Sequence, residues 1–256
     1  MAARIVAFVN QKGGVGKTTT AVNVAAALAK HGQRVCLVDL DPQGNATSAS
    51  GLALGGSGAY ELLRGDAPLD ECVTEAEEEG FWVVPAGPAL AGAEVELVGM
   101  MARERRLAIG LEPGRERFDW MLIDCPPALG LITLNALTAA DSVIIPVQCE
   151  YMALEGLSHV SETLELVRKN LNPAMRIFGV VLTMFDGRTR LSQQVVDEVR
   201  SHFEETAFET VIPRAVRLSE APSYGQSIFR YEPNGRAAAA YDALGREILA
   251  RAGVPV

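Results

Sequence analysis

Cysteine is scarce in this sequence, and the few cysteines present form no metal-binding pattern. There are four, widely separated along the chain: Cys36, Cys72, Cys125 and Cys149. No CxxC pair and no Cys/His cluster occurs, so the spacing disfavours a metal or iron–sulfur site. We expect free thiols, as in proteins of the reducing cytoplasm.

Long apolar runs and an excess of positive charge are also missing. No apolar run approaches the roughly 18 residues that a membrane-spanning helix needs. The apolar segment before Asn10 and Lys12 is too short for a signal peptide and fits a first strand. The formal net charge of −9 argues by itself against nucleic acid as a partner. Binding to nucleic acid would therefore require a local group of basic residues.

The length and the order of apolar segments favour one α/β domain spanning residues 1–256. We expect strands at residues 5–9, 34–39, 81–85, 118–124, 142–147 and 176–185, with a short edge strand at 211–213. Helices are expected at 21–29, 59–64, 154–171, 191–203 and 236–252. A further helix is expected at 92–111, with Val95, Leu97, Val98 and Leu107 on one side. The separate acidic run 75–79 is expected on a solvated face. This alternation predicts a doubly wound, mainly parallel sheet of the P-loop NTPase type.

A glycine-rich loop joins the first predicted strand to the first predicted helix. Residues 10–20 read NQKGGVGKTTT, which departs from the general phosphate-loop pattern because Gln11 replaces the first glycine. Three glycines still allow close approach of the backbone to phosphates, and successive N–H groups at a helix N-terminus form an anion site. Lys17 is expected to reach the β- and γ-phosphates, and the Thr18 hydroxyl to bind Mg²⁺.

The alternative is a glycine-rich turn that binds nothing, which would leave the lysines and threonines of this loop without a packing purpose. We therefore predict a nucleotide site in which the loop supplies Lys12, Gly13, Gly14, Val15, Gly16, Lys17, Thr18 and Thr19.

Three aspartates follow predicted strands, at the sheet edge where open α/β proteins bind their ligands. Asp124 ends one strand and is the candidate for holding Mg²⁺ through water; the alternative is a helix N-cap. Asp41 lies beyond another strand and is expected to position the attacking water, unless it only caps the turn at Pro42. Asp39 lies inside that strand and is expected to support the loop.

The second lysine of the loop points to a family. Because Lys17 already serves the nucleotide, Lys12 has no ordinary role, and the loop resembles the deviant Walker A motif of the ParA/MinD group of ATPases. The resemblance implies that Lys12 crosses a dimer interface to the phosphates of the partner subunit and takes part in catalysis with Lys17 and Asp41. The segment 39–45 (DLDPQGN) is similar to the second acidic motif of the group, whose later aspartate acts in hydrolysis.

Longer matches indicate the chromosomal ParA (Soj) branch of this group. They cover residues 91–97, 123–127, 182–189 and 212–223. The last match adds Pro213 to the nucleotide-binding candidates and departs from the branch at Ala215, where asparagine is common. The resemblance implies ATP and Mg²⁺ as cofactors, an ATP-dependent homodimer, an ATPase that is slow alone, and a ParB-like partner that stimulates it.

Four arginines are candidates for the local group of basic residues that binding of nucleic acid by this acidic chain would require. Arg188 and Arg190 flank the loop after the last long strand, and Arg214 and Arg217 flank the edge strand. The alternative is scattered solubilising charge, which composition alone favours. The resemblance favours binding of nonspecific double-stranded DNA, since ParA proteins use basic residues in these regions. It also implies that the protein is associated with the nucleoid.

Two rival functions share the loop. A MinD-like protein anchors to membranes through a C-terminal amphipathic helix, but residues 244–256 have no aromatic residue and little basic bias, so we expect no stable membrane binding. A reductase similar to the nitrogenase iron protein needs cluster-binding cysteines, and Cys125 has no suitable second cysteine. A relative that positions another cargo on the nucleoid stays open.

Overall fold

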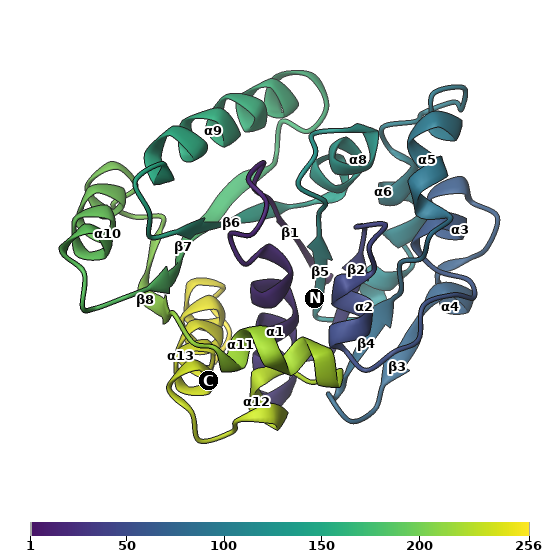
Figure 1. Ribbon diagram of the computed structural model, residues 1–256. Coiled ribbons are helices and arrows are strands. Elements are labelled where there is room, and N and C mark those ends of the chain that lie inside the picture. The colour runs from purple at the N-terminus through teal and green to yellow at the C-terminus, as the bar shows by residue number, and fades with distance from the viewer. Residues whose placement is uncertain (1, 256) are drawn as a thin grey trace.

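The chain folds around one eight-stranded sheet flanked by helices (Figure 1). The computed structural model describes residues 2–255. The strand order is β3-β4-β2-β5-β1-β6-β7-β8, and every pairing is parallel except that of β3 with β4. The strands are β1 (Arg4–Phe8), β2 (Val35–Asp39), β3 (Thr74–Ala76), β4 (Phe81–Val84), β5 (Trp120–Asp124), β6 (Ser142–Gln148), β7 (Arg176–Phe185) and β8 (Ala207–Pro213). The predicted doubly wound, mainly parallel sheet is confirmed.

Helices cover both faces of this sheet. The longer helices are α1 (Lys17–Lys30), α5 (Leu90–Leu97), α8 (Leu131–Ala139), α9 (Ala153–Asn170), α10 (Arg190–His202) and α13 (Arg236–Arg251). The shorter ones are α2 (Asn45–Ala49), α3 (Ala59–Arg64), α4 (Leu69–Cys72), α6 (Arg106–Leu111), α7 (Gly114–Arg117), α11 (Arg217–Glu220), the 3₁₀ turn η1 (Ala221–Tyr224) and α12 (Ile228–Tyr231). No helix among the described residues is both long and apolar enough to cross a membrane.

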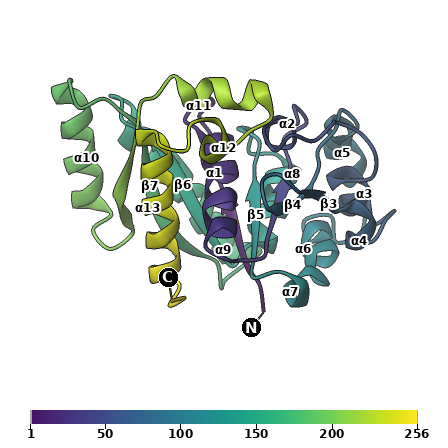
Figure 2. The ribbon, with the colours of Figure 1, turned by 90° about the horizontal axis from the view of Figure 1, so that it is seen from below.

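Alternate residues of the central strands feed two separate cores. Ile5 and Ala7 of β1 face the core made with α3, α5, α6, α8, α9 and α10. Val6 and Phe8 face the other core, which is made with α1, α12 and α13. Those three helices lie beside one another in the view from below (Figure 2). A strand that is buried on both faces has to be apolar at nearly every position, which explains the continuous apolar runs in the sequence.

The parallel register brings the functional strand ends to one level. Asp124 of β5 is paired with Phe8 of β1 on one side and with Asp39 of β2 on the other. The glycine-rich loop leaves β1 immediately after Phe8. The two aspartates and the loop therefore meet at the carboxyl edge of the sheet, where this class of fold binds ligands.

One predicted helix is wrong. Residues 92–111 form the separate helices α5 and α6, joined by a loop in which Ala102 has a φ of 52°. Asn135 of α8 stabilises this break, because its side chain accepts from the Leu107 N–H at 3.1 Å and donates to the Arg103 carbonyl at 2.7 Å. Leu107 is buried as expected, whereas Val95 is 79% exposed.

Two smaller expectations also need correction. The edge strand β8 is longer than the predicted 211–213 and begins at Ala207. The acidic run 75–79 is not wholly solvated, because Glu79 is buried. Its carboxylate accepts from the Ser227 N–H at 2.9 Å and lies 3.6 Å from the Arg230 guanidinium. These partners come from the α12 region, about 150 residues away in sequence.

Candidate nucleotide-binding site

The glycine-rich loop has a backbone that requires glycine at two positions. Gly14 and Gly16 have φ values of 74° and 84°, in the left-handed region that other residues rarely adopt. Gly13 is exposed, and a Cβ atom added to it would meet no other atom within 4 Å. The glycines at 14 and 16 therefore set the curvature of the loop, while Gly13 leaves its outer surface bare.

Two side chains hold this loop in place: Asn10, which lies shortly after β1, and Thr183 of β7, which is separated from β1 by β6. The Asn10 amide donates to the Pro146 carbonyl at 2.7 Å, and its oxygen accepts from the Lys12 N–H at 3.0 Å. The Thr183 hydroxyl of β7 donates to the Val15 carbonyl at 2.8 Å. Neither Asn10 nor Thr183 was predicted as a site residue. Asn10 did have a signal in the sequence, since it is a polar residue directly after an apolar run.

Lys17 is the buried cation at the centre of the site. Only 7% of its surface is exposed, and its Nζ donates to the Lys12 carbonyl at 3.4 Å. Burial lowers the pKa of Lys17, while the nearby Asp124, Cys125 and Asp41 oppose that shift. The ammonium has one long hydrogen bond to the loop, and a phosphate oxygen would give it the charge-assisted partner that it lacks.

Asp39 supports the loop that follows β2, as predicted. Its carboxylate accepts from the N–H and the hydroxyl of Thr47, both at 2.8 Å, and from the Asp41 N–H at 3.1 Å. Burial raises the pKa of Asp39 to about 6, although these hydrogen bonds oppose the rise. The oxygen of the Thr47 hydroxyl in turn accepts from the Ala86 N–H at 2.9 Å. Through Thr47, Asp39 at the end of β2 is therefore linked to the segment that follows β4.

Asp124 is equally buried but has no such partners. Neither of its carboxylate oxygens has a hydrogen-bond partner among residues 2–255. Burial, together with the neighbouring Asp39, raises the pKa of Asp124 well above its ordinary value, while the Thr18 hydroxyl and the Lys17 ammonium oppose that rise. A buried carboxylate without donors is costly unless a cation compensates it.

These residues fit a Mg²⁺ ion bound together with a nucleotide. Magnesium takes oxygen ligands and is commonly held by one or two protein groups plus substrate phosphates. Asp124 and Thr18 offer such oxygens, and no cluster of three or more His, Cys, Asp or Glu side chains in the described part of the chain forms a metal cage of protein ligands alone. The unpaired oxygens of Asp124 are the observation that favours this ion.

Asp41 lies beyond the strand end and is partly exposed. Its Oδ1 accepts from the Gln43 N–H at 3.0 Å, so it does stabilise the turn at Pro42. Its other oxygen has no protein partner within residues 2–255. Asp41 can therefore cap the turn and still present an acceptor toward the site.

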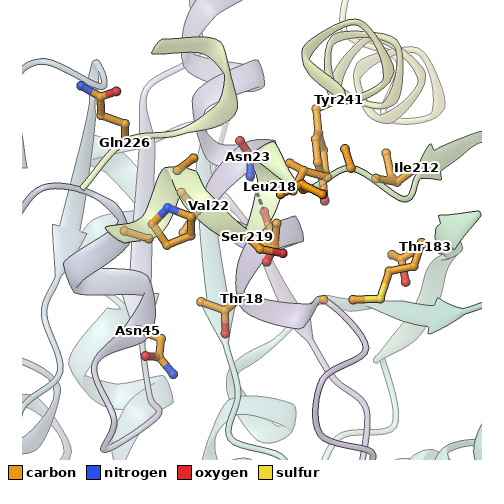
Figure 3. Close-up of a pocket in the computed structure, with 18 of the residues that line it drawn as sticks. Thr18, Val22, Asn23, Asn45, Thr183, Ile212, Leu218, Ser219, Gln226 and Tyr241 are labelled. Atoms are coloured by element: carbon orange, nitrogen blue, oxygen red, sulfur yellow. Dashed lines mark hydrogen bonds between the residues drawn. The ribbon is translucent and has the colours of Figure 1, made fainter. Parts of the chain in front are cut away.

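A cavity of about 650 Å³ opens beside α1 (Figure 3). Four of the predicted nucleotide-binding residues line it, namely Gly16, Thr18, Thr19 and Pro213. Its far wall comes from α11 and η1, which include Leu218 and Ser219, and from Tyr241 of α13. The cavity starts at the end of the glycine-rich loop and extends away from the buried lysine, as expected for the base and sugar of a nucleotide.

Asn23 joins the phosphate-loop helix to the wall of this cavity, and sequence reasoning missed it. Its amide donates to the Thr19 carbonyl at 2.7 Å, and its oxygen accepts from the Ile228 N–H of α12 at 2.7 Å. The sequence did carry a signal, because Asn23 is a polar residue within the otherwise apolar run of α1.

Lys12 points to an acid of its own chain in this structure. Its Nζ lies 3.8 Å from Glu150 Oε2, and both side chains are about half exposed. The other oxygen of Glu150 lies 3.6 Å from the Arg214 guanidinium and also accepts a hydrogen bond from the Gln148 amide. Glu150 thus links the loop lysine to one of the candidate DNA-binding arginines.

The structure brings Arg188 and Arg214 near the same acid, Asp186, and pairs three of the four arginines with acids. Arg188 donates to Asp186 at 2.6 Å, and Arg188 and Arg214 both lower the pKa of Asp186. Arg217 lies farther along, on α11, where it donates to Glu220 at 2.7 Å. Arg190, at the start of α10, is the one of the four with no ion-pair partner in residues 2–255. All four arginines are exposed, but three of them are paired with acids, so they do not form a bare cationic stripe.

Known proteins resemble this chain over nearly its whole length. The family model described as "AAA domain" matches residues 3–177. The chain is 52% identical to the chromosome partitioning protein ParA of Myxococcus xanthus over 97% of this chain and 88% of that protein. It is 51% identical to the chromosome-partitioning ATPase Soj of Thermus thermophilus, over 97% of this chain and 96% of that one.

A solved structure shares the same architecture. It is the cobyrinic acid a,c-diamide synthase of Mycobacterium smegmatis with bound ADP and magnesium, which is 38% identical with a TM-score of 0.78. The likeness covers 92% of this chain and 97% of that one.

Proposed function

The chain belongs to the ParA/Soj family of chromosome-partitioning ATPases, and on that premise we propose that it uses ATP to switch its binding of DNA. In this proposal ATP and Mg²⁺ bind at the glycine-rich loop, two subunits enclose the nucleotides, and the dimer binds nonspecific double-stranded DNA. A ParB-like partner stimulates hydrolysis, which is slow without it, and so releases the DNA. The protein then works in the cytoplasm, on the nucleoid.

The observation that carries the nucleotide part is the buried, unpaired Asp124 beside Lys17. Loop N–H groups and Lys17 would bind the β- and γ-phosphates, while Thr18 and Asp124 would hold the metal. The ion supplies charge neutralisation between the phosphates. Asp41 would accept a hydrogen bond from the attacking water and orient it toward the γ-phosphate. Pro213 and the cavity beside α1 would enclose the base.

The dimer part rests on the exposed outer surface of the loop. Lys17 is buried toward its own site, whereas Lys12 is half exposed and faces outward beside the bare Gly13. A second subunit approaching this surface could offer its phosphates to Lys12 in exchange for Glu150. The exposed ion pair with Glu150 would oppose this exchange only weakly, since such pairs contribute about 0–1 kcal/mol.

The DNA part rests on the arginines near the ends of β7 and β8. Each phosphate contact changes the slope of log affinity against log salt by about −0.9, so a dimer with twice the contacts should have roughly twice the slope. One acidic subunit should therefore hold DNA weakly and the ATP-bound dimer more tightly.

The alternative of a MinD-like, membrane-bound ATPase has less support from the last helix. Tyr241, Leu244, Ile248 and Leu249 of α13 are buried in the core against the sheet and α1. The apolar face of α13 is therefore not available for a lipid surface. Positioning of a cargo other than a chromosome or plasmid is a second version of the same proposal.

Gel-shift titrations with ADP, with ATP, and with ATP plus the ParB-like partner test the proposal at several salt concentrations. Binding should need ATP and decrease when the partner is added. Arg190→Ala and Arg217→Ala should each lower affinity for all sequences alike and flatten the salt dependence, while ATP-dependent dimerisation persists. Equal binding with ADP and ATP would refute the switch. Wild-type affinity in both variants would refute the arginine surface, by which we mean Arg188, Arg190, Arg214 and Arg217.

A further inference from the structure

A groove between α9 and α10 has no role in the nucleotide site or the arginine surface. It encloses about 810 Å³ and is lined by residues from the first turns of α9 and from most of α10. Both helices lie on the same face of the sheet and contact each other (Figure 1). We define the α9–α10 groove by its ten lining residues: Tyr151, Met152, Leu154, Glu155, Leu191, Gln194, Val195, Asp197, Glu198 and Ser201.

Three large apolar side chains are exposed along this groove. Tyr151 is 84% exposed, Met152 48% and Leu191 43%. Single exposed apolar residues are ordinary on a protein surface, but several gathered in one hollow mark an interaction site. Tyrosine and methionine are also enriched in the centres of protein interfaces.

The charge of the groove is of one sign. Glu155, Asp197 and Glu198 line it, and no lysine, arginine or histidine does. None of the three carboxylates forms an ion pair with any residue between 2 and 255, whereas most of the acidic residues near the arginine surface are paired. Asp197 accepts a hydrogen bond from Gln193 on its own helix at 2.9 Å. The groove therefore combines apolar contact area with three uncompensated negative charges.

We propose that the α9–α10 groove is the docking site for a cationic, amphipathic segment of the partner protein that stimulates ATP hydrolysis. This proposal rests on the proposed function, because it assumes such a partner. Lysine or arginine side chains of the segment would pair with the three carboxylates, and its apolar side chains would cover Tyr151, Met152 and Leu191. DNA and acidic lipids do not fit, since their phosphates would meet three carboxylates. A second copy of this acidic chain is a poorer electrostatic match.

The position of the groove connects it to both other sites. Tyr151 directly follows Glu150, whose carboxylate contacts Lys12 and Arg214. Leu191 directly follows Arg190, which is the one of the four candidate DNA-binding arginines without an ion-pair partner among residues 2–255. A segment bound in the groove would thus lie next to the residues that hold the loop lysine and to the start of the arginine surface. This placement gives the partner a short route for influencing hydrolysis and DNA release.

Charge reversal with a matched control tests the proposal. Asp197→Lys with Glu198→Lys should weaken binding of the purified ParB-like protein of the same organism by roughly tenfold or more and remove its stimulation of ATP hydrolysis. The control is Glu75→Lys with Glu77→Lys, which makes the same charge change at exposed, unpaired carboxylates on the opposite edge of the sheet. The control pair should bind the partner like the wild type. Unstimulated ATP hydrolysis should be unchanged in both variants.

A photo-crosslinking amino acid at Tyr151 identifies what occupies the groove. With the ParB-like protein present, the crosslinked peptide should come from that protein and carry at least two basic and two apolar residues. Crosslinks only to a second copy of this chain, or equal weakening of partner binding by both charge-reversal pairs, would overturn the proposal. If the wild type showed no ATP-dependent DNA binding, the proposed function would fail, while the comparison of the two pairs would still decide the groove.

Discussion

Replacing Asp124 with asparagine is expected to stabilise the nucleotide-free protein and to abolish its stabilisation by Mg·ATP. The wild-type carboxylate is fully buried, and neither oxygen accepts a hydrogen bond from residues 2–255. Its raised pKa has burial as the main cause and the neighbouring Asp39 as the second. Asparagine keeps the shape and removes the charge, so the folded state no longer bears the cost of a buried anion that Lys17 and Thr18 compensate only in part.

The size of the effect follows from the difference between two buried groups without partners, because asparagine removes the charge but stays unpartnered. A neutral unsatisfied group costs about 1–3 kcal/mol and a charged one more. Loss of attraction to Lys17 offsets part of this gain. We therefore expect the free energy of unfolding to rise by about 1–2 kcal/mol, which in a domain of this size is roughly 2–4 °C in melting temperature for each kcal/mol.

Asp39→Asn is the matched control, because it is the same substitution on the adjacent strand at the same level. Asp39 accepts three hydrogen bonds, and an amide nitrogen cannot accept. At least one donor from Thr47 or Asp41 would lose its acceptor. We expect this variant to be less stable by about 1–3 kcal/mol. The two substitutions should therefore shift stability in opposite directions.

Thermal unfolding with EDTA, with Mg²⁺ alone and with Mg²⁺ plus ATP measures both effects. The wild type should gain stability with Mg·ATP, since a ligand that binds only the folded state raises its melting temperature. Asp124→Asn should melt higher in EDTA and gain little from Mg·ATP. A variant that melts lower than the wild type in EDTA and keeps the full Mg·ATP shift would show that Asp124 is neither strained nor a metal ligand.

Three further substitutions separate the roles within the site. Lys17→Ala should weaken ATP binding by roughly 10- to 100-fold in equilibrium titrations, because a charge-assisted contact of about 1.5–3 kcal/mol is lost; unchanged affinity would remove Lys17 from the phosphate site. Asp41→Ala should bind ATP but not hydrolyse it, and a normal partner-stimulated rate of ADP release would place the water-positioning role elsewhere. Gly13→Val should fold normally, since a Cβ atom at this exposed position meets no other atom within 4 Å, yet remain monomeric with ATP in light-scattering measurements. An ATP-dependent dimer of this variant would locate the interface on another surface.

The parts of this protein that the sequence predicts well are those in which a residue's role follows from its neighbours along the chain. The strand before Asn10 and the glycines at 14 and 16 lie within a few residues of one another. Apolar strands that are buried on both faces give continuous runs, and such runs identify a parallel sheet without knowledge of their partners. Asp124 is found in the same way, as the first acid after such a run.

The parts that the sequence does not predict depend on contacts between distant segments. The break between α5 and α6 is held by Asn135, which has no neighbour in sequence near residue 102. In the sequence, Glu79 cannot be told apart from the other acids of its run. Its burial depends on Arg230 and the Ser227 N–H, which come from the α12 region. Periodicity describes how one segment faces a core, and it carries no information about a side chain arriving from elsewhere.

One of the candidate arginines shows the same limit in the functional site. The folded chain places a carboxylate against Arg188, Arg214 and Arg217, but the partners of Arg188 and Arg217 lie only two and three residues away in sequence, and only Glu150 reaches its arginine, Arg214, from a distant segment. These pairs are exposed and therefore contribute little stability, about 0–1 kcal/mol each. A DNA phosphate competing for such an arginine displaces only a weak partner, but it must also approach the displaced carboxylate. Arg190 has no ion-pair partner among residues 2–255 and carries neither cost, so among the four it should contribute most to the first contact with DNA. The acids beside the other three should weaken DNA binding by a single subunit.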